Sequence, residues 1–203
     1  MKQPDSWINH EYADYCWNCK GEKIIFATFN NQATSDRARE GLFSSLVSTF
    51  GTLEGLHFLD LFAGSGAVGV EALSRGAGLV ESVESNSTSS DICEQNFNLL
   101  TEIEGVGKFK VHNKTVFEFL NHSAINTYEI IYIDPPYEVS NSEVEKILRK
   151  IIMLNLLNKF GVVAIERDGK AKPFLWPDGL TELKVRSYGA GSIHYGVITE
   201  RTL

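Results

Sequence analysis

A glycine-rich turn between a strand-like segment and a helical one limits what this chain can fold into. The turn, Gly64-Ser65-Gly66-Ala67-Val68-Gly69, fits the pattern G-x-G-x-x-G. It directly follows the apolar segment 57–62 and opens a helical pattern over residues 67–75. Glycines tolerate positive φ and allow a ligand to approach the backbone closely. A turn of this kind in this setting is typical of nucleotide binding at the carboxyl end of a strand.

Strand and helix patterns alternate along the rest of the chain. Further strands are expected at residues 79–84, 108–112, 128–134 and 161–166, and further helices at 87–100, 115–120 and 142–157. This order predicts an α/β fold with a mostly parallel sheet covered by helices on both faces. The last β-rich segments, 180–187 and 193–199, flank a glycine-rich turn, which predicts a C-terminal hairpin with one antiparallel strand.

The residues before the glycine turn divide into an extension and the start of the main domain. A short strand is expected at residues 23–29, and a helix at 37–50 with Thr34-Ser35-Asp36 as its N-cap, whereas residues 1–22 read as irregular. We therefore predict a small N-terminal extension with short strands over residues 1–33 and one main α/β domain over residues 34–203.

Charge and hydropathy narrow the class of protein. No apolar stretch is long enough for a membrane helix, and the polar N-terminus lacks the apolar core of a signal peptide, so we expect a cytoplasmic enzyme, and a monomer. The net charge of −7 argues against a broadly basic face. Contacts to phosphates should therefore come from a local patch, for which the candidates are Lys20, Lys23, Arg37 and Arg39.

The three cysteines predict neither a metal site nor a disulfide framework. Cys16 and Cys19 form one C-x-x-C pair, but a zinc site needs two more ligands and no second pair exists. The odd number of cysteines and the missing export signal argue against disulfides. We expect no bound metal.

Two acidic residues help to identify the cofactor that the glycine turn would bind. Glu84 lies where both a dinucleotide and S-adenosylmethionine would need a carboxylate for their ribose hydroxyls. Asp60 lies at the strand tip beside the turn, where its negative charge suits the positively charged amino-acid end of S-adenosylmethionine and would repel a pyrophosphate. S-adenosylmethionine is therefore the expected cofactor. Further contacts are expected from Phe62, Ala63, Gly64, Ser65, Gly66 and Ser85.

A second motif, Asp134-Pro135-Pro136-Tyr137, follows the apolar segment 128–133. The exocyclic amine of a nucleobase is a weak nucleophile, because its lone pair is delocalised into the ring. The Asp134 carboxylate and the Pro135 carbonyl could hold both N–H bonds while the nitrogen pyramidalises towards a methyl donor. Consecutive prolines restrict the backbone, and Tyr137 offers a ring for stacking a base that has been swung out of any paired structure. Together the two motifs predict methyl transfer to a nucleobase amine.

Three segments resemble a known family. Residues 34–43 (TSDRAREGLF), 59–77 (LDLFAGSGAVGVEALSRGA) and 131–137 (IYIDPPY) are similar to the bacterial 16S ribosomal RNA guanine-N2 methyltransferases. The last segment is shared with other DNA and RNA amino-methylating enzymes, and the first two are more specific. The resemblance implies the class I S-adenosylmethionine-dependent methyltransferase fold, a Rossmann-like sheet of seven strands, with residues 34–203 as the methyltransferase domain and an N-terminal extension that helps to bind RNA.

The resemblance also implies roles for individual residues. Asp60, Gly64 and Gly66 would touch the amino-acid end of the cofactor, Glu84 its ribose, and residues 134–137 the target base, with Arg37 near the active site. The family usually has an acidic residue near the adenine where this chain has His112-Asn113-Lys114-Thr115, so Asn113 or Thr115 is expected there. The implied product is N2-methylguanine, with ribosomal RNA or the assembling small ribosomal subunit as the partner.

Other functions stay open on the sequence. The same motifs would serve an enzyme that methylates adenine in DNA or glutamine in a protein, although little of the chain is left for a separate DNA-recognition domain. A non-catalytic subunit that binds S-adenosylmethionine or RNA is disfavoured by the intact motifs. A nicotinamide dehydrogenase would need a hydride-transfer residue, and none is evident.

Overall fold

The computed structural model describes residues 13–17, 23–27, 36–122, 127–170 and 174–199. Near the N-terminus, β1 (Ala13–Trp17) and β2 (Lys23–Ala27) pair antiparallel in a two-stranded sheet of their own. β2 agrees with the predicted strand, whereas β1 shows that the expectation of irregular structure up to residue 22 was wrong. Tyr15 and Trp17 are residue types that favour strands, so the signal was present. The division of the chain at residue 33 stays a prediction.

Seven strands form the main sheet, in the order β5-β4-β3-β6-β7-β9-β8. Their bounds are β3 His57–Leu61, β4 Leu79–Glu84, β5 Lys108–Asn113, β6 Tyr128–Ile133, β7 Leu157–Asp168, β8 Leu180–Tyr188 and β9 Gly191–Ile198. β5, β4, β3, β6 and β7 are parallel, and β9 runs antiparallel to both β7 and β8, with a register shift in β8 between Glu182 and Lys184. The predicted seven-stranded sheet with an antiparallel C-terminal hairpin is confirmed.

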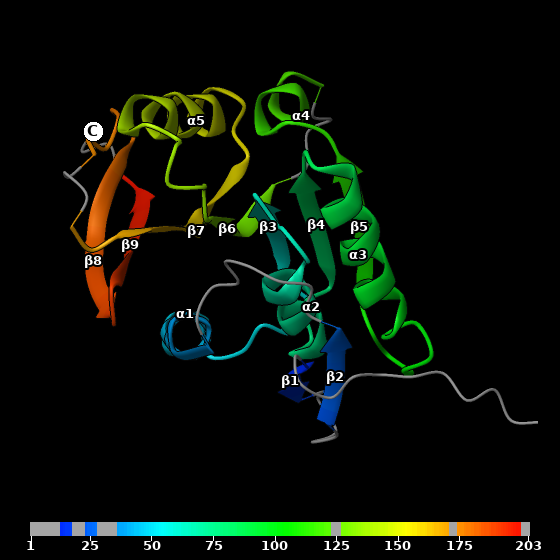
Figure 1. Ribbon diagram of the computed structural model, residues 1–203. Helices are drawn as coiled ribbons and strands as arrows, with labels where there is room; N and C mark the ends of the chain where they lie inside the picture. The colour runs from blue at the N-terminus through cyan, green and yellow to red at the C-terminus, as the bar shows by residue number, and fades with distance from the viewer. Residues whose placement is uncertain (1–12, 18–22, 28–35, 123–126, 171–173, 200–203) are drawn as a thin grey trace, which may run out of the picture.

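Helices cover both faces of this sheet. They are α1 Asp36–Phe50, α2 Ala67–Ser74, α3 Ser87–Asn98, α4 Val116–His122 and α5 Asn141–Met153. Figure 1 shows α4 and α5 along one side of the sheet, opposite α1 and α2. Buried side chains of α1, α2 and α3 pack with Phe58 and Tyr132, whereas those of α4 and α5 pack with Leu61 and Ile133. No helix in these described ranges is both long enough and apolar enough to cross a membrane.

The strand order reverses between β3 and β6, and this reversal positions the candidate site. From β3 the chain goes on to β4 and β5 on one side, and from β6 it goes on to β7 on the other. Ligands of open α/β sheets bind at such a switch point, beyond the carboxyl ends of the strands. The glycine turn follows β3 and the Asp134 motif follows β6, so both predicted motifs lie at the tips of neighbouring strands.

α5 ends before the predicted boundary at residue 157. Asn155 takes a left-handed conformation with a φ of 51°, and the N–H of Leu156 donates to the carbonyl of Ile151 at 3.0 Å. This pattern ends a helix, and asparagine tolerates it better than most residues. Leu157 then begins β7, which is longer than the predicted strand. Periodicity failed here because a short apolar run fits either a helix or a strand.

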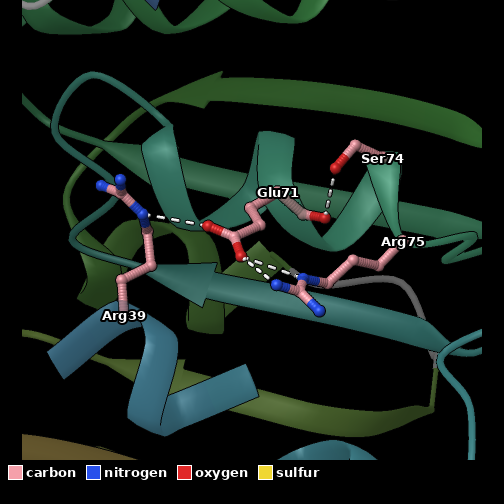
Figure 2. A network of polar contacts seen from close by, with 4 residues as sticks. All are labelled: Arg39, Glu71, Ser74 and Arg75. Atoms are coloured by element: carbon pink, nitrogen blue, oxygen red, sulfur yellow. Dashed lines mark hydrogen bonds and ion pairs between the residues drawn. The ribbon is translucent and has the colours of Figure 1, made fainter. Parts of the chain in front are cut away.

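A buried network of ion pairs joins α1 to α2 (Figure 2). The Glu71 carboxylate of α2 accepts from Arg39 Nε at 3.0 Å, and from Nε and Nη2 of Arg75 at 2.9 and 2.7 Å. The Arg39 and Glu71 side chains are 7% and 10% exposed, and that of Arg75 is 41% exposed. Loss of Glu71 would leave the Arg39 charge in the interior, which makes this carboxylate the critical member of the network.

We expect Glu71→Ala to lower the free energy of unfolding by about 3–5 kcal/mol, because it removes the counter-charge of buried Arg39. Arg75→Ala is the matched control and should cost about 1 kcal/mol or less, because its side chain is far more exposed. Urea denaturation followed by circular dichroism measures both changes. Equal losses in the two variants would contradict this account of the network.

Candidate active site

The turn after β3 is held in an unusual backbone conformation. Phe62, Gly64 and Gly66 have φ angles of 70°, 55° and 79°, and the value for Phe62 is rare for a residue with a side chain. The N–H groups of Phe62 and Ala63 both donate to the Val83 carbonyl of β4, at 3.1 and 2.9 Å. A Cβ at Gly66 would overlap Cys93 Sγ, whereas one at Gly64 would meet nothing within 4 Å. The backbone of the turn is therefore tightly packed against α3 at Gly66, whereas at Gly64 there is open space beside it.

Glu84, at the end of β4, fixes the position of the turn. One carboxylate oxygen accepts the Gly64 N–H at 2.9 Å, and the other accepts the Asn86 N–H at 2.7 Å. Each oxygen keeps a second lone pair, so the carboxylate can still accept from hydroxyl groups. Asn96 Nδ2 of α3 donates to the Ser65 carbonyl at 2.9 Å. The turn is thus braced before any ligand arrives.

Asp60, near the end of β3, is an almost fully buried carboxyl. It is 1% exposed, and neither oxygen accepts a hydrogen bond of good geometry from the described residues. Burial, chiefly, raises its pKa to about 8; the charges of Asp134 and Glu84 add to the rise, and the Gly69 N–H opposes it. A carboxyl in this state is stabilised by a cation or hydrogen-bond donor. The ammonium group of S-adenosylmethionine fits this requirement.

The last residue of β5, Asn113, lies beside the Glu84 loop. Asn113 Nδ2 donates to the carbonyls of Glu84 and Ser85, at 3.1 and 3.2 Å, and so ties the ends of β4 and β5 together. The Thr115 hydroxyl donates to Glu118 at 2.7 Å at the start of α4. Asn113 therefore braces the loop, and Thr115 is already engaged at the beginning of a helix.

The Asp134 motif lies directly beside the turn of β3. The Asp134 N–H donates to the Leu61 carbonyl at 3.3 Å, which continues the β3–β6 pairing by one step. Pro135 is buried and Pro136 is exposed, and the Val139 N–H closes a turn onto the Pro136 carbonyl at 2.9 Å. Tyr137 is 70% exposed, so its ring is free to stack against a ligand.

Arg167, near the end of β7, ties the Asp134 loop to the neighbouring strand. Its Nη2 donates to the Val139 carbonyl at 3.1 Å and to Asn141 Oδ1 at 2.9 Å. Burial lowers the pKa of this guanidinium, and the charge of Asp134 opposes that shift. The sequence analysis did not include Arg167 in the site. The sequence feature that could have pointed to Arg167 is its position near the end of the strand that follows the motif.

Glu166 is a second site residue that the sequence analysis missed. Its Oε2 accepts the Tyr132 hydroxyl at 2.6 Å, and burial raises the pKa of its carboxyl while that hydrogen bond opposes the rise. Tyr132 belongs to the core cluster on the α1 side of the sheet, so Glu166 projects on that side, as Asp60 does. Arg167, the next residue, projects on the α5 side.

The candidate phosphate contacts differ in what the structure describes. Arg37 is exposed in the first turn of α1, whereas Arg39 is buried against Glu71, which favours a structural role for Arg39. The Lys23 side chain, Lys20 and Cys19 lie outside the described residues. Within the described part of the chain, no group of three or more His, Cys, Asp or Glu residues could hold a metal ion.

Comparison with known proteins agrees with this geometry. The family model described as conserved hypothetical protein 95 matches residues 17–197. Ribosomal RNA small subunit methyltransferase D of Haemophilus influenzae is 29% identical, over 85% of this chain and 92% of that protein. The protein of the same name from Buchnera aphidicola subsp. Acyrthosiphon pisum is 30% identical, over 75% of this chain and 76% of its own length.

Solved structures share the fold. A presumed methyltransferase of Escherichia coli superposes with a TM-score of 0.71 at 23% identity, covering 89% of this chain and 94% of that one. A Streptococcus mutans protein solved with SAH superposes with a TM-score of 0.62 at 17% identity, covering 97% of this chain and 57% of that one. The fold is that of the S-adenosylmethionine-dependent methyltransferases. The chain belongs to the family described as conserved hypothetical protein 95 and is a relative of the ribosomal RNA small subunit methyltransferases D.

Proposed function

We propose that this protein transfers a methyl group from S-adenosylmethionine to the exocyclic N2 amine of a guanine in 16S ribosomal RNA. Relatives named ribosomal RNA small subunit methyltransferase D support an RNA substrate. One observation carries the chemistry: the Asp134 carboxylate lies close enough to Asp60 for its charge to raise the Asp60 pKa. The Asp134 N–H also donates to the Leu61 carbonyl at 3.3 Å, so the glycine turn and the Asp134 motif lie at one edge of the sheet.

Different residues at these strand ends hold different parts of the cofactor. Asp60 binds the ammonium end, residues 62–66 line the amino-acid part, and Glu84 accepts from the ribose hydroxyls with the lone pairs that its backbone bonds leave open. The Asn113 amide nitrogen donates to the carbonyls of Glu84 and Ser85, which leaves its carbonyl oxygen for the adenine amine, with Ser85 and Thr115 nearby. When bound, S-adenosylmethionine supplies a methyl group on a positively charged sulfur.

The Asp134 motif prepares the amine. The Asp134 carboxylate and the Pro135 carbonyl accept its two N–H bonds, which directs the nitrogen lone pair out of the ring plane. As the new N–C bond forms, positive charge grows on the nitrogen, and the two oxygens stabilise it because they are already in place. Asp134 accepts the proton that the nitrogen then loses. Tyr137 and Pro136 flank the ring of the base.

RNA is held mainly outside the pocket. Contacts to the RNA phosphates come from the N-terminal extension, residues 1–33, which includes Lys20 and Lys23, and from Arg37. The chain as a whole is acidic, so only a local group of cationic residues can attract the phosphates. Arg39 contributes indirectly by anchoring α1. The protein acts as a monomer in the cytoplasm, on ribosomal RNA or the assembling small subunit.

A tritiated methyl-transfer assay on small-subunit particles, bulk RNA, DNA and protein tests the proposal, followed by digestion and mass spectrometry of the labelled nucleoside. We expect N2-methylguanosine from one position of 16S ribosomal RNA. Asp134→Ala should lower the rate by about 10²–10⁴-fold, since it removes one acceptor and the proton acceptor. Glu138→Ala, an exposed carboxylate just beyond the motif, should keep activity. Label in DNA or protein, or an active Asp134→Ala enzyme, would refute the proposal.

Cofactor binding should release a proton from Asp60. The carboxyl is protonated in the free protein below its pKa of about 8, and the cofactor ammonium group favours the ionised form. Between pH 6 and 8 the affinity should therefore rise with pH, by up to about tenfold per unit. Calorimetry in two buffers of different ionisation enthalpy should give about one proton released at pH 6.5, and none for Asp60→Asn. Equal proton release by both proteins would contradict this linkage.

Asp60→Asn should also stabilise the cofactor-free protein. The folded pKa, about 8, lies above the ordinary value of 3.8, so ionisation opposes folding from pH 3.8 upward, and this cost grows until pH 8. The asparagine carries no such cost. Thermal melts across this range should show the variant gaining stability with rising pH relative to the parent, and a constant difference would argue against a buried acid.

Arg167→Met tests the tie between β7 and the Asp134 loop. It should lower kcat by about 10-fold or more while the affinity for S-adenosylmethionine stays unchanged, because the loop orients the base and not the cofactor. Lys170→Met, an exposed cation just beyond the same strand, is the control. Titration calorimetry and steady-state rates separate the two effects. A weakened cofactor affinity with normal kcat would assign Arg167 to the other half of the pocket.

A further inference from the structure

Glu166 lies near the tip of β7, the strand next to the Asp134 motif. Cofactor residues come from the ends of β3, β4 and β5, and the next strand tip beyond the Asp134 motif belongs to β7. Ile133 of β6 pairs with Ile165 of β7, so Asp134 and Glu166 follow this pair at the same level of the sheet. Neighbouring strands lie about 4.8 Å apart, so the two acidic residues stand side by side.

Both carboxyl groups project from the same face of the sheet. Side chains alternate along a strand, and Asp134 has the parity of Tyr132, as Glu166 has that of Ala164. Tyr132 and Ala164 both belong to the core cluster beneath α1 and α2. The hydrogen bond from the Tyr132 hydroxyl agrees with this placement of Glu166. The Asp134 charge acts on Asp60 on this face and also on Arg167 on the other, as expected for a carboxylate just beyond the tip of β6.

The Glu166 carboxyl is held firmly at one oxygen and is available at the other. Oε2 accepts the Tyr132 hydroxyl, and Tyr132 is 1% exposed, so this side of the carboxyl is fixed by a buried group. Oε1 accepts no hydrogen bond within the described part of the chain, and it is not among the polar atoms that are buried without a partner. Oε1 lies towards Gly191 of β9, where a Cβ would stand 3.5 Å from it, and glycine has no side chain to cover it. Oε1 is therefore an oriented acceptor on this edge of the sheet.

We propose that Glu166 selects guanine by accepting a hydrogen bond from its N1–H, next to the N2 amine held by Asp134. This inference rests on the proposed function and adds the source of base specificity. Guanine presents N1–H and N2–H as adjacent donors, so two neighbouring carboxylates match that edge. Adenine presents an unprotonated N1, which would face the Glu166 oxygen and be repelled.

Other acidic side chains near this edge do not suit the role. Asp60 and Glu84 belong to the cofactor half. Asp168, two residues farther along β7, is exposed, and its Oδ1 already accepts the Lys170 N–H at 2.9 Å. Asp168 shares the strand and the side of Glu166 without its buried support, so Asp168→Asn is a matched control.

Replacement of the target guanine by 2-aminopurine tests the proposal. The position comes from the mapping experiment above, and the modified small-subunit RNA can be made by ligation. 2-Aminopurine keeps the N2 amine, but its N1 is an acceptor. Inosine, which lacks the amine, should give no product in any enzyme. The measured quantity is the ratio of kcat/KM for guanine to that for 2-aminopurine.

The parent enzyme should prefer guanine by about 10- to 100-fold, as expected when a charged group loses its hydrogen-bond partner. Glu166→Gln should lower this preference by about 10-fold or more, because its amide can donate to the N1 of 2-aminopurine while its oxygen still accepts from Tyr132. Asp168→Asn should leave the ratio unchanged. Tyr132→Phe, which frees the carboxyl but keeps its charge, should lower the ratio by a smaller factor, about 3-fold.

The proposal would be overturned if the Glu166→Gln enzyme folds, as judged by its thermal melt, and keeps the parent ratio. Asp134 would then be the residue that accepts the N1–H. A ratio near one in the parent enzyme would overturn it as well. If the parent fails to methylate guanine at all, the proposed function itself falls, so the two failures are distinguishable.

Discussion

The hydrogen bonds between the tips of β3, β4 and β6 are the constraint on which the site depends. Phe62 and Ala63 donate to Val83 of β4, Gly64 donates to Glu84, and Asp134 donates to Leu61. These bonds join the glycine turn and the Asp134 motif at one edge of the sheet. The parallel pairing of the central strands fixes the spacing between the two motifs. The reversal of strand order at this point keeps the connecting helices to either side of it.

The same edge concentrates acidic groups, and this has a cost in stability. Asp60, Glu84, Asp134 and Glu166 lie at the ends of neighbouring strands. Burial, together with the charges of Asp134 and Glu84, raises the pKa of Asp60, and burial raises the pKa of Glu166. A site that awaits a positively charged cofactor and a substrate rich in N–H donors gains from such an arrangement, because those ligands supply the missing partners. The buried Arg39–Glu71 ion pair offsets part of the cost by joining α1 to α2.

Much of this structure was predictable from local patterns. The strand that ends at Leu61, the glycine turn and the strand before Asp134 each combine an apolar run with an unambiguous stop signal, and their positions agree with the structure. The end of α5 was not predictable from periodicity, because the left-handed Asn155 interrupts an apolar run that suits both helix and strand. Glu166 and Arg167 were missed for another reason. Their roles depend on partners, Tyr132 and Val139, that are close only once β6 and β7 pair.

β5 and β8 are the outermost strands of the main sheet, and within the described part of the chain each has a neighbouring strand on one side only. Each carries cationic residues at alternate positions, Lys108 and Lys110 on β5 and Lys184 and Arg186 on β8. The register shift before Lys184 further disturbs the outer ladder. Cationic, irregular borders discourage edge-to-edge pairing of copies. The charged borders therefore disfavour growth of the sheet into aggregates, while interior strands such as β6 keep their apolar side chains in the core.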